Sequence, residues 1–269
     1  MSESARALSA WNWEPSVLLG IALLVSAYLT AIGPSRSRFP SSAKVKRAQV
    51  VSFLVGAFIM LFALVSPLDE IGDRYLFSVH MTQHLLLTLV APPLMLLGTP
   101  GWLLRPLLRD PVIRRAARFF TLPLVAFALF NIDFIVWHLP PLYEATLHSN
   151  VLHIFEHLLF IGTAFLNWWP ILSPLPELPR LPAPAQILYL FAQALPATLL
   201  GAFIVFAPVP LYPTYAAAPN LFGIDPMSDQ QFSGLIMWMP GGMVYLLALS
   251  VVFFTWLERD ERAERKPMA

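Results

Sequence analysis

The sequence predicts an all-α integral membrane protein whose single domain, 1–269, is a bundle of seven transmembrane helices. Composition is the first observation: 57% of the 269 residues are apolar and only 12% are charged, against a charged share of roughly 25% in soluble globular domains. The second observation is that seven apolar stretches reach the roughly 17 to 25 residues that a spanning helix needs. Helices are favoured because backbone groups in lipid must be hydrogen-bonded within their own segment. The expected spans lie near 15–32, 49–66, 76–97, 120–138, 150–170, 184–206 and 232–256.

The distribution of basic residues is the third observation, and it sets the expected orientation. Every lysine and arginine except Arg6 and Arg74 falls on one side of a seven-span chain. The positive-inside rule therefore predicts an N-terminus outside the membrane and a C-terminus in the cytoplasm. The basic segments are 33–48, 98–119, 171–183 and the C-terminal tail, which includes Arg265 and Lys266.

Composition also excludes several classes of function. The chain has no cysteine, so it has no disulfide, no thiolate metal site and no cysteine nucleophile. It lacks the basic stripe that nucleic acid requires, and no phosphate-binding loop or nucleophile elbow indicates a soluble catalytic domain. We therefore expect no nucleic-acid partner and no soluble small-molecule substrate.

The connections on the expected outer side are acidic. Such a face would attract cations weakly, although acids also remain wherever basic residues are excluded. The run Asp229-Gln230-Gln231 stands at the start of the seventh span on this side. It could cap the helix, or it could contact a cation or a partner. The other outer acids are Asp69, Glu70, Asp73, Glu144 and Asp225.

All six histidines gather near this same face. Two pairs stand four residues apart, at the starts of the third and fifth spans, so each pair can direct two imidazoles at one point. Both spans enter from outside, which places the pairs within roughly two turns of the surface. The pairs are His80 with His84 and His153 with His157, while His138 closes the fourth span and His148 precedes the fifth.

The surroundings of the two pairs are similar to each other. Segments 67–86 and 141–159 each contain a Pro-Leu-x-Glu element followed by a His-x-x-x-His-Leu-Leu pattern. This indicates a parallel internal repeat in which each unit enters the membrane from outside. The match is short enough for chance similarity to be the alternative.

Two such pairs at equal depth favour a metal or metal-cofactor site over packed core histidines. Polar groups in lipid are costly and usually mark a functional interior, and imidazole is a common ligand of copper, zinc and iron. Thioether sulfur suits cuprous copper, although methionine is also an ordinary filler of apolar packing. The alternative is an interhelical hydrogen-bond network that only holds the bundle together. The expected core ligands are His80, His84, His153 and His157, with His138, His148 and Met81 as further candidates.

Asp133 and Glu156 are the acids deepest in the expected spans. Either could orient an imidazole that holds a metal, or relay protons or ions. Otherwise each is a neutral acid bonded to a neighbouring helix.

Several runs between about residues 66 and 240 carry a family resemblance in combination. They are Ser66–Glu70 (SPLDE), Phe77–His84 (FSVHMTQH), Ala91–Pro100 (APPLMLLGTP), Trp137–Pro140 (WHLP), His153 with Glu156-His157, Asn167–Pro170 (NWWP), and Asp229–Gln231 with Met237-Trp238. In these runs the chain resembles the CtaG family of assembly factors for caa3-type cytochrome c oxidase.

The resemblance implies a seven-span protein of the bacterial plasma (inner) membrane that is needed to make active oxidase. It further implies copper as the metal, and an oxidase subunit that carries a copper centre as the partner, besides membrane lipid. We expect an accessory protein and not an enzyme. Because the chain has no cysteine, copper would pass through histidine, methionine or carboxylate.

Two other functions stay open at this point. The histidines could be axial haem ligands of a membrane redox protein. A two-haem electron carrier, however, usually needs a second, deeper haem site to carry electrons across the membrane. A metal or proton transporter could use Asp133 and Glu156, although the expected spans are nearly uncharged toward the cytoplasm.

Overall fold

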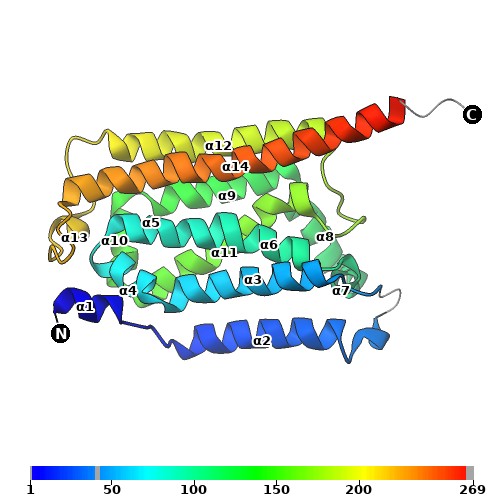
Figure 1. The fold of residues 1–269 in the computed structure, drawn as a ribbon, viewed down its shortest axis with the longest axis horizontal. Helices are drawn as coiled ribbons and strands as arrows, with labels where there is room; N and C mark the ends of the chain where they lie inside the picture. The colour runs from blue at the N-terminus through cyan, green and yellow to red at the C-terminus, as the bar shows by residue number, and fades with distance from the viewer. Residues whose placement is uncertain (1, 40–42, 265–269) are drawn as a thin grey trace, which may run out of the picture.

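The computed structural model describes residues 2–39 and 43–264, and every regular element in these residues is helical (Figure 1). Among the described residues, six helices are long and apolar enough to cross a membrane, and a bent pair would make a seventh. The expected all-α membrane bundle is therefore confirmed. Arg265 and Lys266 lie outside the described residues. The long helices are α2 (Pro15–Ile32), α3 (Arg47–Val65), the continuous helix Phe77–Gly98, α11 (Asn150–Leu172), α12 (Ala183–Val205) and α14 (Pro226–Glu264).

The fourth expected span differs from the other six. Its helix, α9 (Pro123–Trp137), has 15 residues and so rises about 22 Å, less than the roughly 30 Å of a hydrocarbon core. It follows α8 (Pro111–Phe120) after a bend of 71°. Proline opens both helices, a position where its missing N–H costs nothing. Three arginines and exposed apolar side chains make α8 a helix of the kind that lies along a membrane surface.

Short helices close the two ends of the bundle (Figure 1). At one end, which we call the acidic end, they are α1 (Glu3–Leu8), α4 (Pro67–Arg74), α10 (Pro140–His148) and α13 (Pro213–Ala216). At the other end, the basic end, they are η1 (Arg36–Arg38), α7 (Gly101–Leu104), η3 (Arg105–Arg109) and α8. The acidic and basic connections thus separate as expected, while the side that faces the cytoplasm stays a prediction. A short helix precedes a long one in both 67–86 and 141–159, and the internal repeat itself also stays a prediction.

The third span is not uniformly α-helical. It consists of α5 (Phe77–Leu85), a π-helical segment η2 (Leu86–Val90) and α6 (Ala91–Gly98). Pro92 has no N–H for the carbonyl of Thr88, which accepts instead from Trp168 Nε1 at 3.1 Å. Such π segments are frequent next to functional sites, and this one begins two residues after His84.

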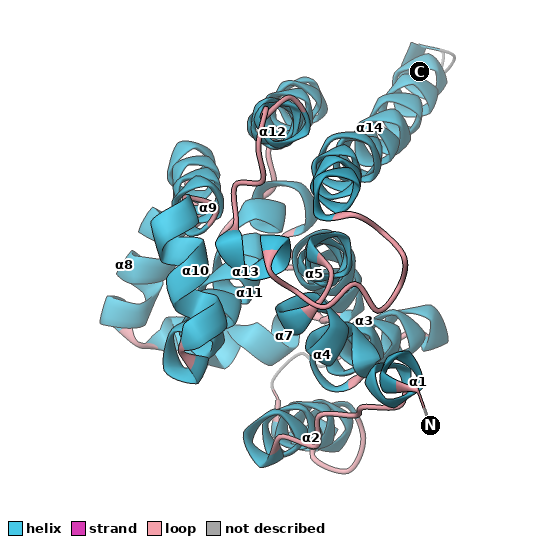
Figure 2. Cartoon of the chain, turned by 90° about the vertical axis from the view of Figure 1, so that its left-hand side faces the viewer, coloured by secondary structure: helices cyan, strands magenta, loops and turns pink. Residues whose placement is uncertain are grey.

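Close backbone contacts hold the long helices together. A Cβ atom on Gly201 of α12 would lie 2.7 Å from the carbonyl oxygen of Gly234 on α14, and one on Gly56 of α3 would lie 2.8 Å from that of Ala91. Small residues allow this approach, which is the usual way helices pack in lipid. Viewed from the acidic end, α5 lies at the centre of the bundle, and α2 lies at its edge (Figure 2).

Candidate metal centre

Four histidines from two helices meet in the half of the bundle near the acidic end. His80 and His84 come from α5, and His153 and His157 come from α11. The ring centroids within each pair lie 4.2 Å apart, and those of His84 and His157 lie 5.4 Å apart between the helices. The two motifs converge, while their role as metal ligands stays a prediction.

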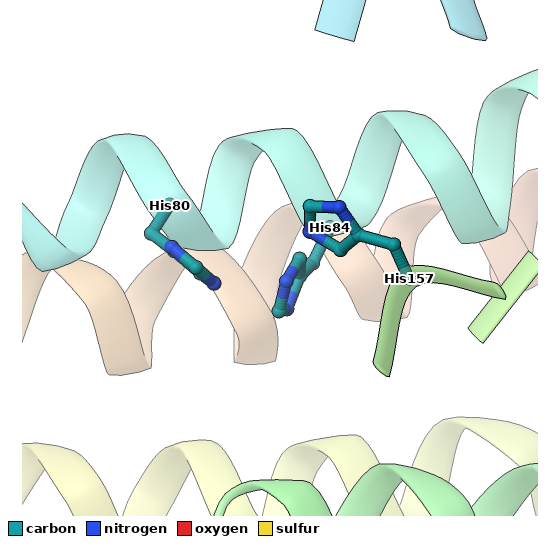
Figure 3. Close-up of side chains that lie close together, drawn as sticks. All are labelled: His80, His84 and His157. Carbon is teal, nitrogen blue, oxygen red and sulfur yellow. The ribbon is translucent and has the colours of Figure 1, made fainter. Parts of the chain in front are cut away.

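The donor atoms form two overlapping groups of a size that could hold a metal ion. The deep group is His80, His84 and His157 (Figure 3), and the surface group is Asp73, His80 and His153. Within each group, one donor atom from each residue lies within 4.8 Å of the others. His80 belongs to both groups, so it is the residue through which they are joined.

These imidazoles are buried and leave most of their nitrogens without partners. The exposed fractions are 0% for His80, 3% for His84, 7% for His157 and 9% for His153. Among the described residues, both ring nitrogens of His80 and of His84, and Nε2 of His153 and of His157, have no hydrogen-bond partner. Leaving one buried polar group unsatisfied costs about 1–3 kcal/mol. A metal cation among them would satisfy several of these nitrogens at once.

The deep group fits a small transition-metal ion. With metal–nitrogen bonds of about 2.0–2.1 Å, two ligand nitrogens of a tetrahedral site lie about 3.4 Å apart. Side-chain movements of about an ångström would therefore bring the three rings from their present spacing into coordination. Three neutral imidazoles suit copper, zinc or iron, and they leave a fourth position for another ligand.

Met81 and His138 lie beside the deep group. His138 Nδ1 contacts the carbonyl oxygen of Phe134 at 2.6 Å, and its Nε2 lies 3.3 Å from Met81 Sδ. With Nδ1 as the donor to Phe134, Nε2 of the neutral ring is unprotonated and can bind a cation. The His138 ring centroid lies 6.2 Å from that of His84. A nitrogen and a thioether sulfur are therefore available at the margin of the deep group.

The start of α5 is fixed by a residue of α14. Asp229 accepts hydrogen bonds from the backbone N–H of Phe77 at 2.7 Å and of Ser78 at 3.2 Å, and from Ser78 Oγ at 2.5 Å. Asp229 therefore caps α5, which begins three residues before His80, while Asp225 accepts from the first backbone N–H groups of α14. The Asp229 side chain had two interpretations from the sequence, and its observed contacts are those of a cap in trans.

Contacts between α4 and α5 hold His80 in place from the acidic end. A Cβ atom on Gly72 would lie 3.0 Å from His80 Cα and 3.1 Å from its backbone nitrogen, so a side chain here would force α4 and α5 a few tenths of an ångström apart. Gln83 donates to Asp69 Oδ1 at 2.9 Å, and Asn12 donates to the other oxygen of that carboxylate at 2.8 Å. These bonds tie the short helix α4 to the histidine-bearing helix.

Asp73 is the group member that the sequence did not single out. Its Oδ1 lies 3.2 Å from His80 Nδ1, and its Oδ2 lies 3.4 Å from His153 Nδ1. Burial raises the pKa of this carboxyl to about 6, against the lowering effect of the His153 charge. The sequence analysis placed Asp73 only among the acids of the outer connections, because its approach to the histidines depends on the turn between α4 and α5.

The remaining candidates occupy different surroundings. The side chain of His148 is 69% exposed and lies 3.6 Å from Glu144, in neither donor group. Asp133 accepts from Thr163 Oγ1 at 2.8 Å, between α9 and α11, and is also in neither group. Glu156 is fully buried, and neither of its oxygens has a hydrogen-bond partner among the described residues. Of the two acids, Glu156 is the one with free capacity to relay a proton or balance a charge.

One family of known proteins matches most of the chain. Its description is cytochrome c oxidase caa3 assembly factor, and the match covers residues 26–259. No solved structure matches the chain.

Similar proteins occur in mycobacteria. Uncharacterized proteins of Mycobacterium bovis and Mycobacterium tuberculosis are each 25% identical over 96% of this chain, and one of Mycobacterium leprae is 25% identical over 80% of it. The aligned region is 41% of the length of the first two and 35% of the third. The chain therefore spans less than half of these relatives, whose names state no activity.

Proposed function

The chain belongs to the family of cytochrome c oxidase caa3 assembly factors, and from this premise we propose that it binds copper through the deep group and supplies it to the oxidase. One observation carries the proposal: three buried imidazoles from two helices, with donor nitrogens within 4.8 Å of one another. The oxidase subunit that carries a copper centre is the proposed recipient. The proposed location is the bacterial plasma membrane, with the acidic end outward.

Copper is favoured by the ligands around the deep group. Imidazole alone suits several metals, whereas thioether sulfur selects cuprous copper. Met81 Sδ lies 3.3 Å from His138 Nε2, so both donors are at hand next to His84. The chain has no cysteine, and histidine and methionine are the donors left to hold a cuprous ion.

Haem ligation fits this centre less well. The cavity that His84 lines has a volume of about 20 Å³, close to the space of a single water. Pockets for organic ligands usually measure about 300–1,000 Å³. A cavity of about 650 Å³ does lie between α2, α3, α6 and α11, but none of the described histidines lines it.

Transport through the bundle would need a path toward the basic end. The polar groups that lie there form a closed, uncharged network. Gln193 donates to Asn167 Oδ1, Asn131 donates to Gln193 at 2.8 Å, and Asn167 donates to Tyr245 at 3.0 Å. Tyr189 also donates to Asn167 at 3.0 Å. These side chains bond to one another, which favours binding at the acidic end over passage.

Copper titration of the purified protein tests the proposal. In detergent and under reducing, oxygen-free conditions, we expect one cuprous ion to bind tightly in competition with a coloured chelator. His84→Ala and His157→Ala each remove one of three ligands and should weaken binding by well over the ~10–100-fold that outer partners of a ligand contribute. The same variants should lower the copper content of the oxidase in cells.

His148→Ala is the matched control, because it removes an exposed histidine from the same end of the protein. It should bind copper as the unmodified protein does. A protein that binds no copper, or deep-group variants with unchanged affinity and unchanged oxidase copper, would refute the proposal. A Soret band in the purified protein would instead support a haem protein.

A further inference from the structure

We infer that Asp73, His80 and His153 form a second copper site, at which the ion arrives before it reaches the deep group. The inference rests on the proposed copper function and adds to it a place of arrival and a route. The surface group is the second set of donor atoms that lie within 4.8 Å of one another. It shares only His80 with the deep group.

The contacts of Asp73 have the spacing of a metal site. Its two oxygens lie 3.2 Å from His80 Nδ1 and 3.4 Å from His153 Nδ1. Metal–oxygen and metal–nitrogen bonds of about 2.0–2.2 Å place tetrahedral ligand atoms about 3.3–3.5 Å apart. Both distances are therefore close to those that a bound ion imposes.

The contact between Asp73 and His80 does not have the geometry of a hydrogen bond. Among the described residues, Asp73 Oδ1 and His80 Nδ1 lack a hydrogen-bond partner although they lie 3.2 Å apart. Two donor atoms at the contact between Asp73 and His80 thus stay unsatisfied, and a cation between this carboxylate and this imidazole would satisfy both.

Charge and exposure make the surface group the place of arrival. The Asp73 side chain is 26% exposed, whereas that of His80 is fully buried. A carboxylate also attracts a cation that approaches from the acidic end. The deep group, by contrast, consists of three buried imidazoles.

His80 links the two sites. Its Nδ1 is the nitrogen beside Asp73, and the tip of its ring points toward His84 (Figure 3). Movement inward would break the bonds from the ion to Asp73, His153 and Nδ1 of His80, and form bonds to His84, His157 and the other ring nitrogen of His80. The number of ligand bonds and the oxidation state of the ion stay the same, and no thiolate is needed.

A role for Asp73 in only orienting His80 and His153 leads to different results. An orienting carboxylate acts through the rings it holds, so its loss weakens the deep group by ~10–100-fold. An orienting carboxylate would not bind copper by itself once the ligands of the deep group are removed. The two roles therefore separate when the deep group is disabled.

The test uses cupric ion, as a paramagnetic probe in place of cuprous ion, added in detergent to the whole 269-residue chain. In the His84→Ala/His157→Ala variant, we expect one weaker cupric site with two nitrogens and one carboxylate oxygen, seen by electron paramagnetic resonance. Adding Asp73→Asn should abolish that signal. Glu70→Gln is the matched control, because it removes one negative charge from the same short helix outside the group. If the double variant does not fold, Asp73→Asn alone should slow copper loading at least about tenfold, as loss of a charge that attracts the ion does, and leave the final affinity unchanged.

The outcomes separate the two proposals. A double variant that retains an Asp73-dependent site, or slow loading of Asp73→Asn alone, supports the surface site. Tight copper binding that His84→Ala weakens, without any effect of Asp73→Asn on residual binding or on loading, refutes the surface site and leaves the proposed function standing. Weaker final affinity of Asp73→Asn, with no site in the double variant, also refutes it in favour of orientation. A protein that binds no copper refutes both.

Discussion

Gly72→Ala is expected to weaken copper binding without unfolding the protein. The added Cβ atom would lie 3.0 Å from His80 Cα, whereas ordinary van der Waals contact begins at 3.4 Å. His80 or α4 must therefore shift by at least about 0.4 Å, and metal sites hold their ligand distances within about 0.2 Å. We expect affinity to fall by about tenfold, the lower end of what partners outside the ligand set contribute. Alanine gains about 0.5–1 kcal/mol in a helix over glycine, which offsets part of the strain.

Gly162→Ala is the matched control for this experiment. Gly162 lies on α11, the helix of His153 and His157, and an added Cβ atom would meet nothing within 4 Å. The assays are competition with a copper chelator and thermal unfolding, each with both variants and the unmodified protein. Equal affinity in all three proteins would refute the argument that the approach of α4 positions His80. A large loss of thermal stability in Gly72→Ala would refute the expectation that this substitution disturbs the copper site without unfolding the protein.

Three further substitutions test other contacts. Met81→Leu keeps the volume of a buried side chain and removes the sulfur, so cuprous affinity should fall by about tenfold while cupric affinity stays unchanged. Gly201→Val places a branched side chain against the Gly234 carbonyl and should cost about 1–3 kcal/mol, as overpacking does, measured as a lower unfolding midpoint. Asp229→Asn loses charge-assisted bonds to the start of α5 and should cost about 1.5–3 kcal/mol, measured in the same way.

Each of these expectations has an outcome that contradicts it. Equal loss of cuprous and cupric affinity in Met81→Leu would place the sulfur in packing and not in ligand selection. An unchanged midpoint for Gly201→Val would mean that α12 and α14 separate easily. Asp229→Asn with full stability would show that α5 begins correctly without the cap, and its copper affinity would then be expected to stay normal.

Length and hydropathy were sufficient for most of the fold. Lipid requires long apolar helices, so the expected spans agree with helices of the structure within a few residues, apart from the seventh, whose helix α14 begins at Pro226 and extends to Glu264. The fourth expected span, 120–138, also agrees in position with α9, but the apolar window did not register the bend of 71° before Pro123. The π segment after His84 was also not expected, since it depends on which carbonyls the prolines release.

The candidate centre was predictable where it depends on helix periodicity and not where it depends on tertiary contacts. The i, i+4 spacing places His80 beside His84 and His153 beside His157, and the structure has both pairs together. Asp73 reaches the same place only through the turn that reverses the chain after α4. Asp229 reaches α5 across 152 positions of sequence. A single sequence gives no signal for either contact.

Two buried polar clusters of this chain, the histidines and the residues around Asn167, differ in how far their hydrogen bonds are satisfied. The Asn167 cluster shows what a structural network looks like here: its amides and tyrosine hydroxyls bond to one another. None of them is among the described buried atoms that lack a partner. The imidazoles a few turns away are as deeply buried, yet six of their ring nitrogens have no hydrogen-bond partner in the part of the chain that the structure describes. At about 1–3 kcal/mol for each unsatisfied group, such an arrangement lowers stability and would not serve to hold the bundle together. The free nitrogens therefore favour a site that is completed by a ligand over a network that is complete in itself.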